Sequence, residues 1–320
     1  MAGQLTEETE GHAFGLSRSE IQNIAGLLRP GSSAGFLLVE HVWVRDLKGA
    51  IRDAGGFPLG EGFLTPEVLG ARMGVDTTNG DGFGVGWYDP DGQIPAVFRS
   101  IEPAWNDRNH REVASHVHSP LFLAHIRAST GTAVQQTNCH PFRYGEWLGV
   151  HNGLVRDFHL VKRDLALTVD ESLYPYMEGS ADSEMLFYLA LTFGLEDDPP
   201  KAVERMVGFV EEVGHRHVTK HPIQMTIGTT DGKSVWAFRY SSERKSRSLF
   251  YSTDVRTVRK LYPERQRLQE VSDETRIVVS EPLGDLPGAW NEVPESSYAV
   301  VQEGDDELRP FRPAHFRNGG

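Results

Sequence analysis

Near the middle of the chain, residues 147–153 read Trp-Leu-Gly-Val-His-Asn-Gly. The apolar run up to His151 is typical of a buried β-strand, and the Asn152-Gly153 pair that follows is a frequent hairpin turn. Similar short strands are predicted on both sides, separated by clusters of Gly, Pro, Asp and Asn. They are expected at Phe36–Val44, Gly82–Tyr88, Ala96–Arg99, Leu121–Arg127, Ile223–Thr229, Ser234–Tyr240, Ser248–Ser252 and Arg276–Ser280.

Helical patterns are concentrated in a middle block of the chain. They are predicted at Arg108–His118, Asp182–Phe193 and Pro200–Gly214. Because strands come in runs and helices lie apart from them, the sequence favours an α+β fold of largely antiparallel sheets over a doubly wound parallel sheet. Residues 1–33 are expected to be a leader with one short helix, and residues 34–320 a single domain.

Composition excludes several classes of protein. The 320 residues include 45 acidic and 32 basic side chains, and a net charge of −13 argues against a nucleic-acid partner or an anionic membrane surface. The longest uncharged apolar run, Met185–Leu195, is too short to span a membrane, and the acidic N-terminus is unlike a signal peptide. The single cysteine, Cys139, excludes a disulfide framework. We therefore expect a cytoplasmic protein without a metal or cofactor.

Two glycine-rich patterns are interpreted as structural. Residues 31–35 match the G-x-S-x-G nucleophile elbow, but they lie between a helix and a strand, in the reverse of the order that the motif requires. Residues 80–86 suggest a dinucleotide loop, yet Val85 stands where the third glycine is needed. A turn that enters a strand at close backbone approach is the better interpretation.

The histidine and cysteine patterns are also interpreted as structural. His215, His217 and His221 have a spacing that suits a metal, but no well-placed carboxylate or cysteine completes the set, so a solvated helix end is favoured. Cys139 precedes His140, and adjacent side chains on an extended segment point to opposite faces, so a buried core cysteine is predicted rather than a nucleophile and base.

Polar residues that could bind an amino acid occur in four other segments. The segments are Asn79–Tyr88, His125–Gly131, Asn138–Phe142 and His151–Gly153, with Asp182-Ser-Glu184 downstream. An arginine can bind a carboxylate with two hydrogen bonds, an aspartate can bind an ammonium, and an asparagine amide beside a glycine N–H can stabilise an oxyanion. Such a set suits an amino acid whose distal amide is attacked.

In this order and spacing the segments resemble the class II glutamine amidotransferases, N-terminal-nucleophile hydrolases, and most closely the bacterial stand-alone subgroup that includes ergothioneine-pathway γ-glutamyl amidohydrolases. The resemblance extends from Ala34 to Ser297 and implies a four-layer αββα sandwich. It implies that Arg127 binds the α-carboxylate and Asp182 the α-ammonium, that Asn152 and Gly153 form the oxyanion hole, and that Thr130 and His140 line the pocket. The implied substrate is glutamine or a γ-glutamyl amide.

One position departs from the family pattern. The resemblance implies a catalytic cysteine at the start of the first strand, and Ala34 occupies that position behind 33 further residues. A methyl group cannot attack a carbonyl, so the chain as it stands is expected to lack this activity. Three explanations remain open: a Cys→Ala variant of an enzyme with a cleavable leader, a natural pseudoenzyme that binds a γ-glutamyl compound or a partner protein, or a nucleophilic Ser33 or Ser32. Because no synthetase domain is evident, hydrolysis or a separate partner subunit is expected rather than built-in transfer.

Overall fold

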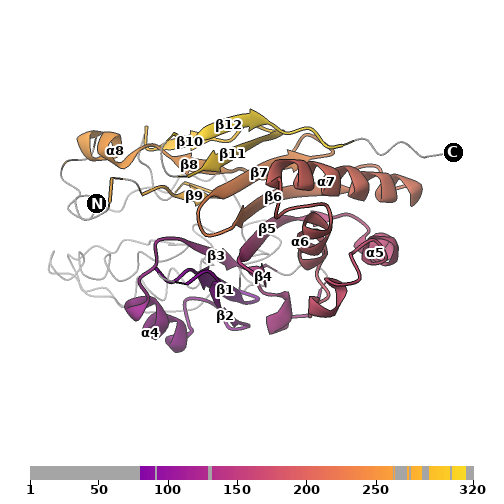
Figure 1. The fold of residues 1–320 in the computed structure, drawn as a ribbon, viewed down its shortest axis with the longest axis horizontal. Coiled ribbons are helices and arrows are strands. Elements are labelled where there is room, and N and C mark those ends of the chain that lie inside the picture. The colour runs from indigo at the N-terminus through magenta and orange to yellow at the C-terminus, as the bar shows by residue number, and fades with distance from the viewer. Residues whose placement is uncertain are drawn as a thin grey trace, which may run out of the picture.

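The computed structural model describes residues 80–90, 92–128, 132–261, 263, 272–273, 275–282, 288–302 and 305–314. The expected leader 1–33, the expected strand Phe36–Val44, Ala34 and Thr130 lie outside the described residues. Figure 1 shows the strands and the helix of residues 83–126 together at one end of the molecule and those described between residues 250 and 292 at the other.

The strand pairs of the described residues are all antiparallel, as the sequence predicts. A three-stranded sheet has β1 at its centre, and its strands are β1 (Phe83–Trp87), β2 (Ala96–Ser100) and β3 (Phe122–Ile126). A six-stranded sheet has the order β12-β11-β7-β6-β5-β4, and a second three-stranded sheet has the order β10-β8-β9. Their strands are β4 (Phe142–Tyr144), β5 (Trp147–Val155), β6 (Ile223–Thr230), β7 (Val235–Ser241), β8 (Phe250–Ser252), β9 (Val278–Val279), β10 (Trp290–Glu292), β11 (Ser297–Val301) and β12 (Glu307–Pro310).

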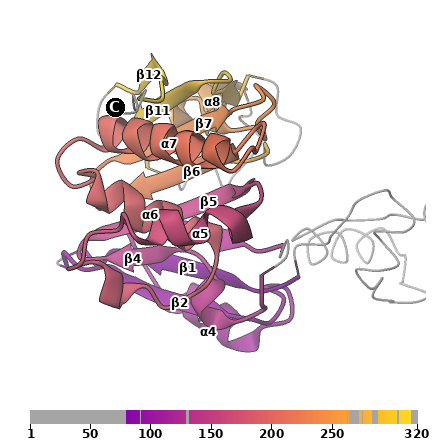
Figure 2. The same ribbon diagram turned by 90° about the vertical axis from the view of Figure 1, so that its right-hand side faces the viewer.

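Helices cover one face of the six-stranded sheet, where α5, α6 and α7 lie in front of β5 and β6 (Figure 2). The helices are α4 (Arg108–His116), α5 (Phe158–Ala166), α6 (Asp182–Thr192), α7 (Pro199–Arg216) and α8 (Val255–Leu261), with 3-10 turns η1 (Gln136–Asn138) and η2 (Tyr174–Tyr176). Helix α7 begins where Asp198 accepts a hydrogen bond from the Lys201 N–H and a proline follows at the first helical position. None of the helices among the described residues is long and apolar enough to cross a membrane.

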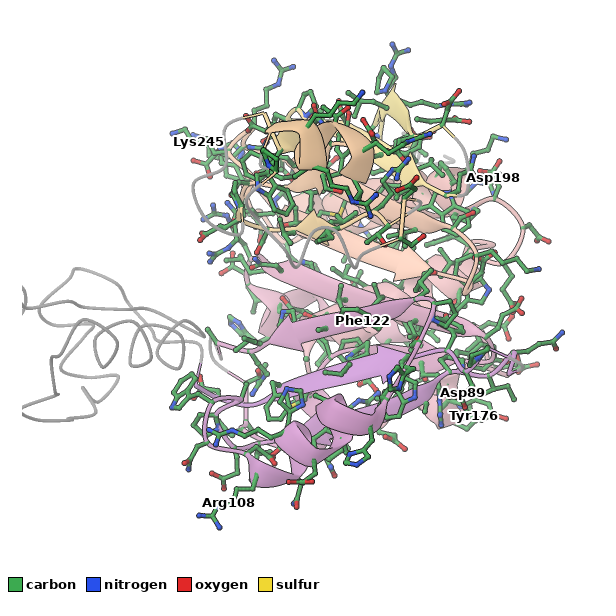
Figure 3. All side chains as sticks on the ribbon, turned by 90° about the vertical axis from the view of Figure 1, so that its left-hand side faces the viewer. Asp89, Arg108, Phe122, Tyr176, Asp198 and Lys245 are labelled. Carbon is green, nitrogen blue, oxygen red and sulfur yellow. The ribbon has the colours of Figure 1, made fainter. Side chains whose placement is uncertain are left out.

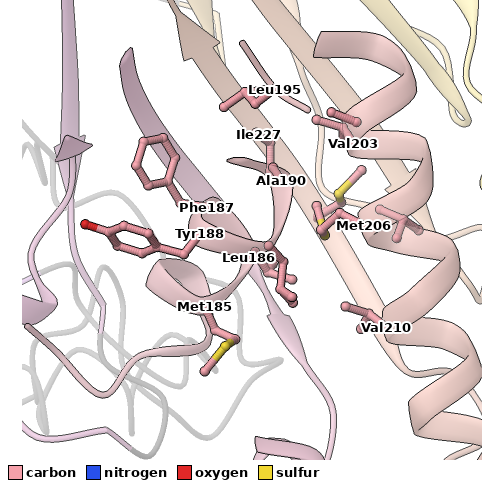
Figure 4. Packing of buried hydrophobic residues seen from close by; sticks show 14 of the residues in the cluster. Met185, Leu186, Phe187, Tyr188, Ala190, Leu195, Val203, Met206, Val210 and Ile227 are labelled. Atoms are coloured by element: carbon pink, nitrogen blue, oxygen red, sulfur yellow. The ribbon is translucent and has the colours of Figure 1, made fainter. Parts of the chain in front are cut away.

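The main core lies between this sheet and the helices (Figure 4). From Ser183 to Leu191 every residue of α6 is buried, because α7 packs against the helix on one side and β5 on another. Side chains of α6 and α7 such as Leu186 and Met206 are almost completely removed from water. Burial of each stabilises the fold by about 1.5–3 kcal/mol. The core therefore fixes the start of α6 relative to β5.

The β2-β1-β3 sheet packs on the other side of β5 through glycines. A Cβ atom on Gly86 would lie 2.9 Å from Cδ1 of Leu148, and one on Gly84 would lie 2.2 Å from the His140 carbonyl oxygen. On the opposite face of β1, the ring of Phe83 meets that of His110 in α4 at a centroid distance of 4.7 Å. The glycine-rich run is thus a strand at close backbone approach, and that prediction is confirmed.

Charged side chains such as Arg108, Asp198 and Lys245 project from the periphery (Figure 3). The alternative interpretation of Asn152-Gly153 as a hairpin turn does not hold, because β5 continues through both residues to Val155. Asn152 pairs with Thr226 and Gly153 with Met225 on β6, so tertiary pairing overrides the local turn preference.

Candidate functional site

The open edge of β5 provides the centre of the candidate site. Strand β4 pairs with β5 only as far as Gly149, whereas β6 follows β5 to Val155. Just past the strand, the Arg156 N–H donates to the Pro222 carbonyl opposite it, 2.8 Å away. Because the bonding direction alternates along an antiparallel ladder, the Gly153 and Val155 N–H groups point away from β6. Beyond Gly149, no described strand pairs with that edge.

Helix α6 binds to this edge through its first residue. Oδ2 of Asp182 accepts a hydrogen bond from the Val155 N–H at 2.8 Å, and Oδ1 accepts one from the Ser183 N–H at 2.8 Å. A carboxylate at a helix N-terminus is also favoured by the positive end of the helix dipole. Asp182 therefore presents a fixed anionic group two residues along the strand from Gly153.

Asn152 and Gly153 lie next to this carboxylate with different orientations. Side chains alternate along a strand, so Asn152 points toward the same side as Leu148, which faces β1, while His151 points toward α6. A Cβ atom on Gly153 would lie 2.1 Å from the Gln224 carbonyl oxygen and 2.6 Å from Nε2 of His151. Only glycine fits there. The pair can supply a backbone and a side-chain N–H to one oxyanion.

Arg127 is held rigidly at the end of β3. The residue is 4% exposed, and its guanidinium donates to the Asp81 carbonyl at 3.3 Å, to Oγ1 of Thr132 at 2.7 Å and to the Ala133 carbonyl at 3.2 Å. Its backbone bonds both ways to the segment before β1, with Gly82 and Asp81 as partners. A planar guanidinium fixed in this way can bind a carboxylate with little loss of conformational entropy.

Three histidines lie between Arg127 and α6, and the resemblance assigned a role only to His140. Nδ1 of His140 lies 2.9 Å from Nδ1 of His125, and Nδ1 of His151 lies 2.8 Å from Oγ of Ser183. Burial lowers the pKa of all three, to about 3 for His125 and well below the usual value for His140; the nearby Asp182 charge opposes the effect at His151. At neutral pH they are uncharged groups that hold the site in place.

His125, His151 and Ser183 had no assigned role in the sequence interpretation. All three lie inside the segments already singled out, beside assigned residues, so their position in those motifs was the available signal. The contact between His151 and Ser183 could not be predicted from the spacing of residues along the sequence, because the two are 32 positions apart.

Cys139 and the histidines near the end of α7 can be compared with their structural interpretation, whereas the G-x-S-x-G pattern at residues 31–35 lies outside the described residues. Cys139 is fully buried, its Sγ donates toward the Ser100 carbonyl at 3.4 Å, and burial raises the pKa of the thiol, as expected for a core residue. His215 lies in the last turn of α7, and Nε2 of His217 lies 3.1 Å from Oδ2 of Asp164. Within the described parts of the chain, no three His, Cys, Asp or Glu side chains gather as they would around a metal ion.

Comparison with known families gives a match over most of the chain. A family model described as class-II glutamine amidotransferases matches residues 67–317. The matched range contains Arg127, Asn152, Gly153 and Asp182, and it begins after Ala34.

Two curated relatives illustrate the similarity. The probable glutamine amidotransferase DUG3 of Saccharomyces cerevisiae is 30% identical over 265 residues, which cover 75% of this chain and 74% of that protein. The gamma-glutamyl-hercynylcysteine sulfoxide hydrolase of Mycobacterium tuberculosis is 41% identical over 78 residues, which cover 24% of this chain and only 33% of that enzyme.

Solved structures agree with the fold. A glutamine aminotransferase class-II domain protein from Silicibacter pomeroyi has a TM-score of 0.61 at 34% identity and covers 72% of this chain and 92% of that one. The glutamine phosphoribosylpyrophosphate amidotransferase of B. subtilis has a TM-score of 0.51 at 16% identity, covering 75% of this chain and 45% of that one, so its likeness concerns the fold alone.

Proposed function

Because the chain belongs to the class II glutamine amidotransferases, we propose that the described site recognises glutamine or a γ-glutamyl amide and holds the amide carbonyl for nucleophilic attack. The observation that carries the proposal is the bond from the Val155 N–H to Asp182, which places an anionic group beside the edge of β5 at Gly153. A substrate with an ammonium at one end and an amide at the other matches this pairing of groups.

Each group has a distinct role in the proposal. The Arg127 guanidinium binds the α-carboxylate, and the Asp182 carboxylate binds the α-ammonium. The Asn152 side chain and the Gly153 N–H stabilise the oxyanion that forms when the amide carbon becomes tetrahedral. His140, and Thr130 outside the described residues, line the pocket. The proposed fold is the four-layer αββα sandwich, supported by α4 on the outer face of the β2-β1-β3 sheet and by α5–α7 on the six-stranded sheet.

The nucleophile belongs at position 34 in this proposal. A cysteine there, freed by removal of residues 1–33, would attack the amide carbon with its sulfur and release ammonia or an amine. The chain has alanine at this position, so we propose that the polypeptide as given binds substrate without turning it over. Hydrolysis, or delivery of ammonia to a separate partner subunit, is favoured over transfer within this chain.

Two alternatives remain for the same site. A natural pseudoenzyme would bind a γ-glutamyl compound or a partner protein without chemistry. Alternatively, Ser33 or Ser32 would become the N-terminal nucleophile after cleavage, with its hydroxyl oxygen in place of sulfur.

Binding tests the recognition half of the proposal. We expect calorimetry of the full chain to detect glutamine or a γ-glutamyl amide. We expect Arg127→Ala to weaken binding by about 2–5 kcal/mol, because the α-carboxylate loses its charged partner. Equal affinity in the variant, or no binding by the parent chain, would contradict the proposal.

Glutamate release tests the catalytic half. Ala34→Cys is made with and without residues 1–33, and turnover is expected only in the trimmed protein, where the α-amine of residue 34 is free to act as base. Turnover in neither form, together with measurable binding, supports the pseudoenzyme. Activity of the unmodified chain that disappears in Ser33→Ala or Ser32→Ala supports a serine nucleophile.

A further inference from the structure

Asn138 is a fully buried amide outside the set of residues with an assigned role. It is the last residue of η1, and its side chain is 0% exposed. Nδ2 donates to the Ala133 carbonyl at 2.9 Å and to Oγ of Ser180 at 3.3 Å, while Oδ1 accepts from the Ser180 N–H at 2.8 Å. All these partners belong to two loops that are otherwise far apart in sequence.

One of these loops carries a contact of Arg127. The Ala133 carbonyl that accepts from Nδ2 of Asn138 also accepts from the Arg127 guanidinium, at 3.2 Å. Oγ1 of Thr132, the neighbouring residue, accepts a second bond from the guanidinium at 2.7 Å. The 132–133 segment therefore fixes the guanidinium, and Asn138 fixes the segment.

The other loop leads directly into Asp182. Ser180 lies two residues before Asp182, and the N–H groups of Glu178 and Gly179 both donate to the Glu184 carboxylate in the first turn of α6. The loop and the helix start thus form one rigid unit. A Cβ atom on Gly179 would lie 2.6 Å from Oδ1 of Asn138, so the amide is packed tightly against this unit.

We propose that Asn138 is a positioning residue that sets the distance between the Arg127 guanidinium and the Asp182 carboxylate. It thereby selects substrates that carry an α-carboxylate and an α-ammonium on the same carbon. The inference rests on the proposed function, because it concerns the same recognition site. The two charges of an α-amino acid have a fixed separation, so both ion pairs form together only if the protein holds its own two groups at a matching separation. In enzyme sites, a displacement of about 1 Å can lower the reaction rate about a hundredfold, which shows how strongly a site depends on such distances.

A ligand with one charge has no such requirement. Glutaramate lacks the α-ammonium of glutamine, and 4-aminobutanamide lacks the α-carboxylate. Each needs only Arg127 or only Asp182, so its affinity depends on one group and not on the distance between two. Loss of the Asn138 amide is therefore expected to weaken glutamine binding selectively.

The experiment compares the affinities of the full chain and its variants for glutamine, glutaramate and 4-aminobutanamide. We expect the parent chain to prefer glutamine over both analogues. Asn138→Ala is expected to weaken glutamine binding by about tenfold or more and to change the two analogues by less than about twofold. Exposed Asn106→Ala is the matched control and is expected to leave all three affinities unchanged.

The outcomes distinguish a failure of the proposed function from a failure of the positioning role of Asn138. A parent chain that binds all three ligands alike, or none, refutes the proposed function itself. A parent chain that prefers glutamine, with the same preference in Asn138→Ala, overturns the positioning role alone. An equal loss for all three ligands also overturns it, because that pattern is general damage to the site.

A second variant keeps the proposal testable if the first variant does not fold. If thermal unfolding shows that Asn138→Ala does not fold, Asn138→Asp takes its place, since it keeps the volume and the acceptor for the Ser180 N–H but removes the donor to Ala133. The same selective loss for glutamine is expected, and an unchanged preference overturns the proposal.

Discussion

The backbone N–H of Val155 donates a 2.8 Å hydrogen bond to Oδ2 of Asp182, so the strand that carries Asn152 and Gly153 is tied to the first residue of α6. Open strand edges leave unpaired N–H groups, which proteins usually cover or pair. Here one such group is paired by a carboxylate, and the neighbouring Gly153 N–H remains on the same edge. One contact thus contributes to the fold and also fixes the geometry of the site.

Asp182→Asn is expected to separate these two contributions. The amide oxygen of asparagine can still accept from the Val155 N–H, but its NH2 group cannot accept from the Ser183 N–H, so we expect the free energy of unfolding to fall by about 1–2 kcal/mol. The negative charge is lost, so glutamine binding is expected to weaken by about 2–5 kcal/mol. Asp182→Ala removes the hydrogen bonds and the charge together, so both stability and glutamine binding are expected to fall. Denaturant titration and calorimetry measure the two effects, and a tight-binding Asp182→Asn protein would contradict the assignment.

Truncation of Met206 in α7 is expected to weaken the support of α6. Met206 is 0% exposed in the main core, so Met206→Ala removes buried methylene groups and leaves a cavity. We expect a loss of about 2–5 kcal/mol in the free energy of unfolding by urea. Leu167→Ala is the control, because that side chain is 73% exposed, and a change there within about 0.5 kcal/mol is expected. Similar losses in both variants would contradict the packing.

Buried apolar strands and strongly periodic helices were predictable from the sequence. Strand β6 runs Ile223–Thr230 where Ile223–Thr229 was predicted, and α6 runs Asp182–Thr192 where Asp182–Phe193 was predicted. Short elements were missed. Helix α5 has only nine residues, and its two fully buried side chains, Val161 and Leu165, give too short a repeat to recognise. Strand β11 was missed as well. It is an inner strand of the sheet because it pairs with β12 on one side and with β7 on the other, and the pairing with β7 is a long-range contact.

The site was predictable only in part for the same reason. Family resemblance assigned roles to Arg127 and Asp182, but the roles of Asn138 and Ser183 depend on contacts across the fold. Asn138 meets Ser180 at a separation of 42 positions. Spacing along the chain carries no information about such a contact until loops and helices are packed.

The neutral histidines are expected to make stability depend on pH. The folded-state pKa of His125 is lowered to about 3, whereas an unfolded histidine titrates near 6.5, so below about pH 6.5 the unfolded chain binds protons that the folded chain does not. Stability is therefore full above pH 6.5 and is lost as the pH falls toward 3, by up to about 1.4 kcal/mol per pH unit for this residue.

His125→Gln tests this expectation. The free energy of unfolding in urea is measured between pH 7 and pH 4.5. We expect it to depend less steeply on pH in the variant, by up to about 1.4 kcal/mol per pH unit, because one group with a lowered pKa is removed. Asn106→Ala, at an exposed residue that does not titrate, is the control and is expected to leave the slope unchanged. A parent protein with no loss of stability on acidification would show that the cluster is charged in the folded state.

Gly153→Ala is expected to damage the edge of β5 that carries the proposed oxyanion hole. The added Cβ would lie 2.1 Å from the Gln224 carbonyl oxygen, a backbone atom that cannot move without shifting β6, and 2.6 Å from the His151 ring. Overpacking of this kind costs about 1–3 kcal/mol of folding free energy. In the trimmed Ala34→Cys protein, loss of a correctly placed oxyanion donor is expected to lower kcat by about 10²–10³.

Gly228→Ala in β6 is the matched control for Gly153→Ala. Its Cβ would meet only Cγ2 of Val150, at 3.2 Å, and a side-chain methyl can give way where a backbone carbonyl cannot. We expect a small change in stability there and full binding of glutamine. If Gly153→Ala and Gly228→Ala lower stability and kcat to the same extent, the Gly153 N–H has no special place in the site, because the damage would then be that of any crowded glycine in this sheet.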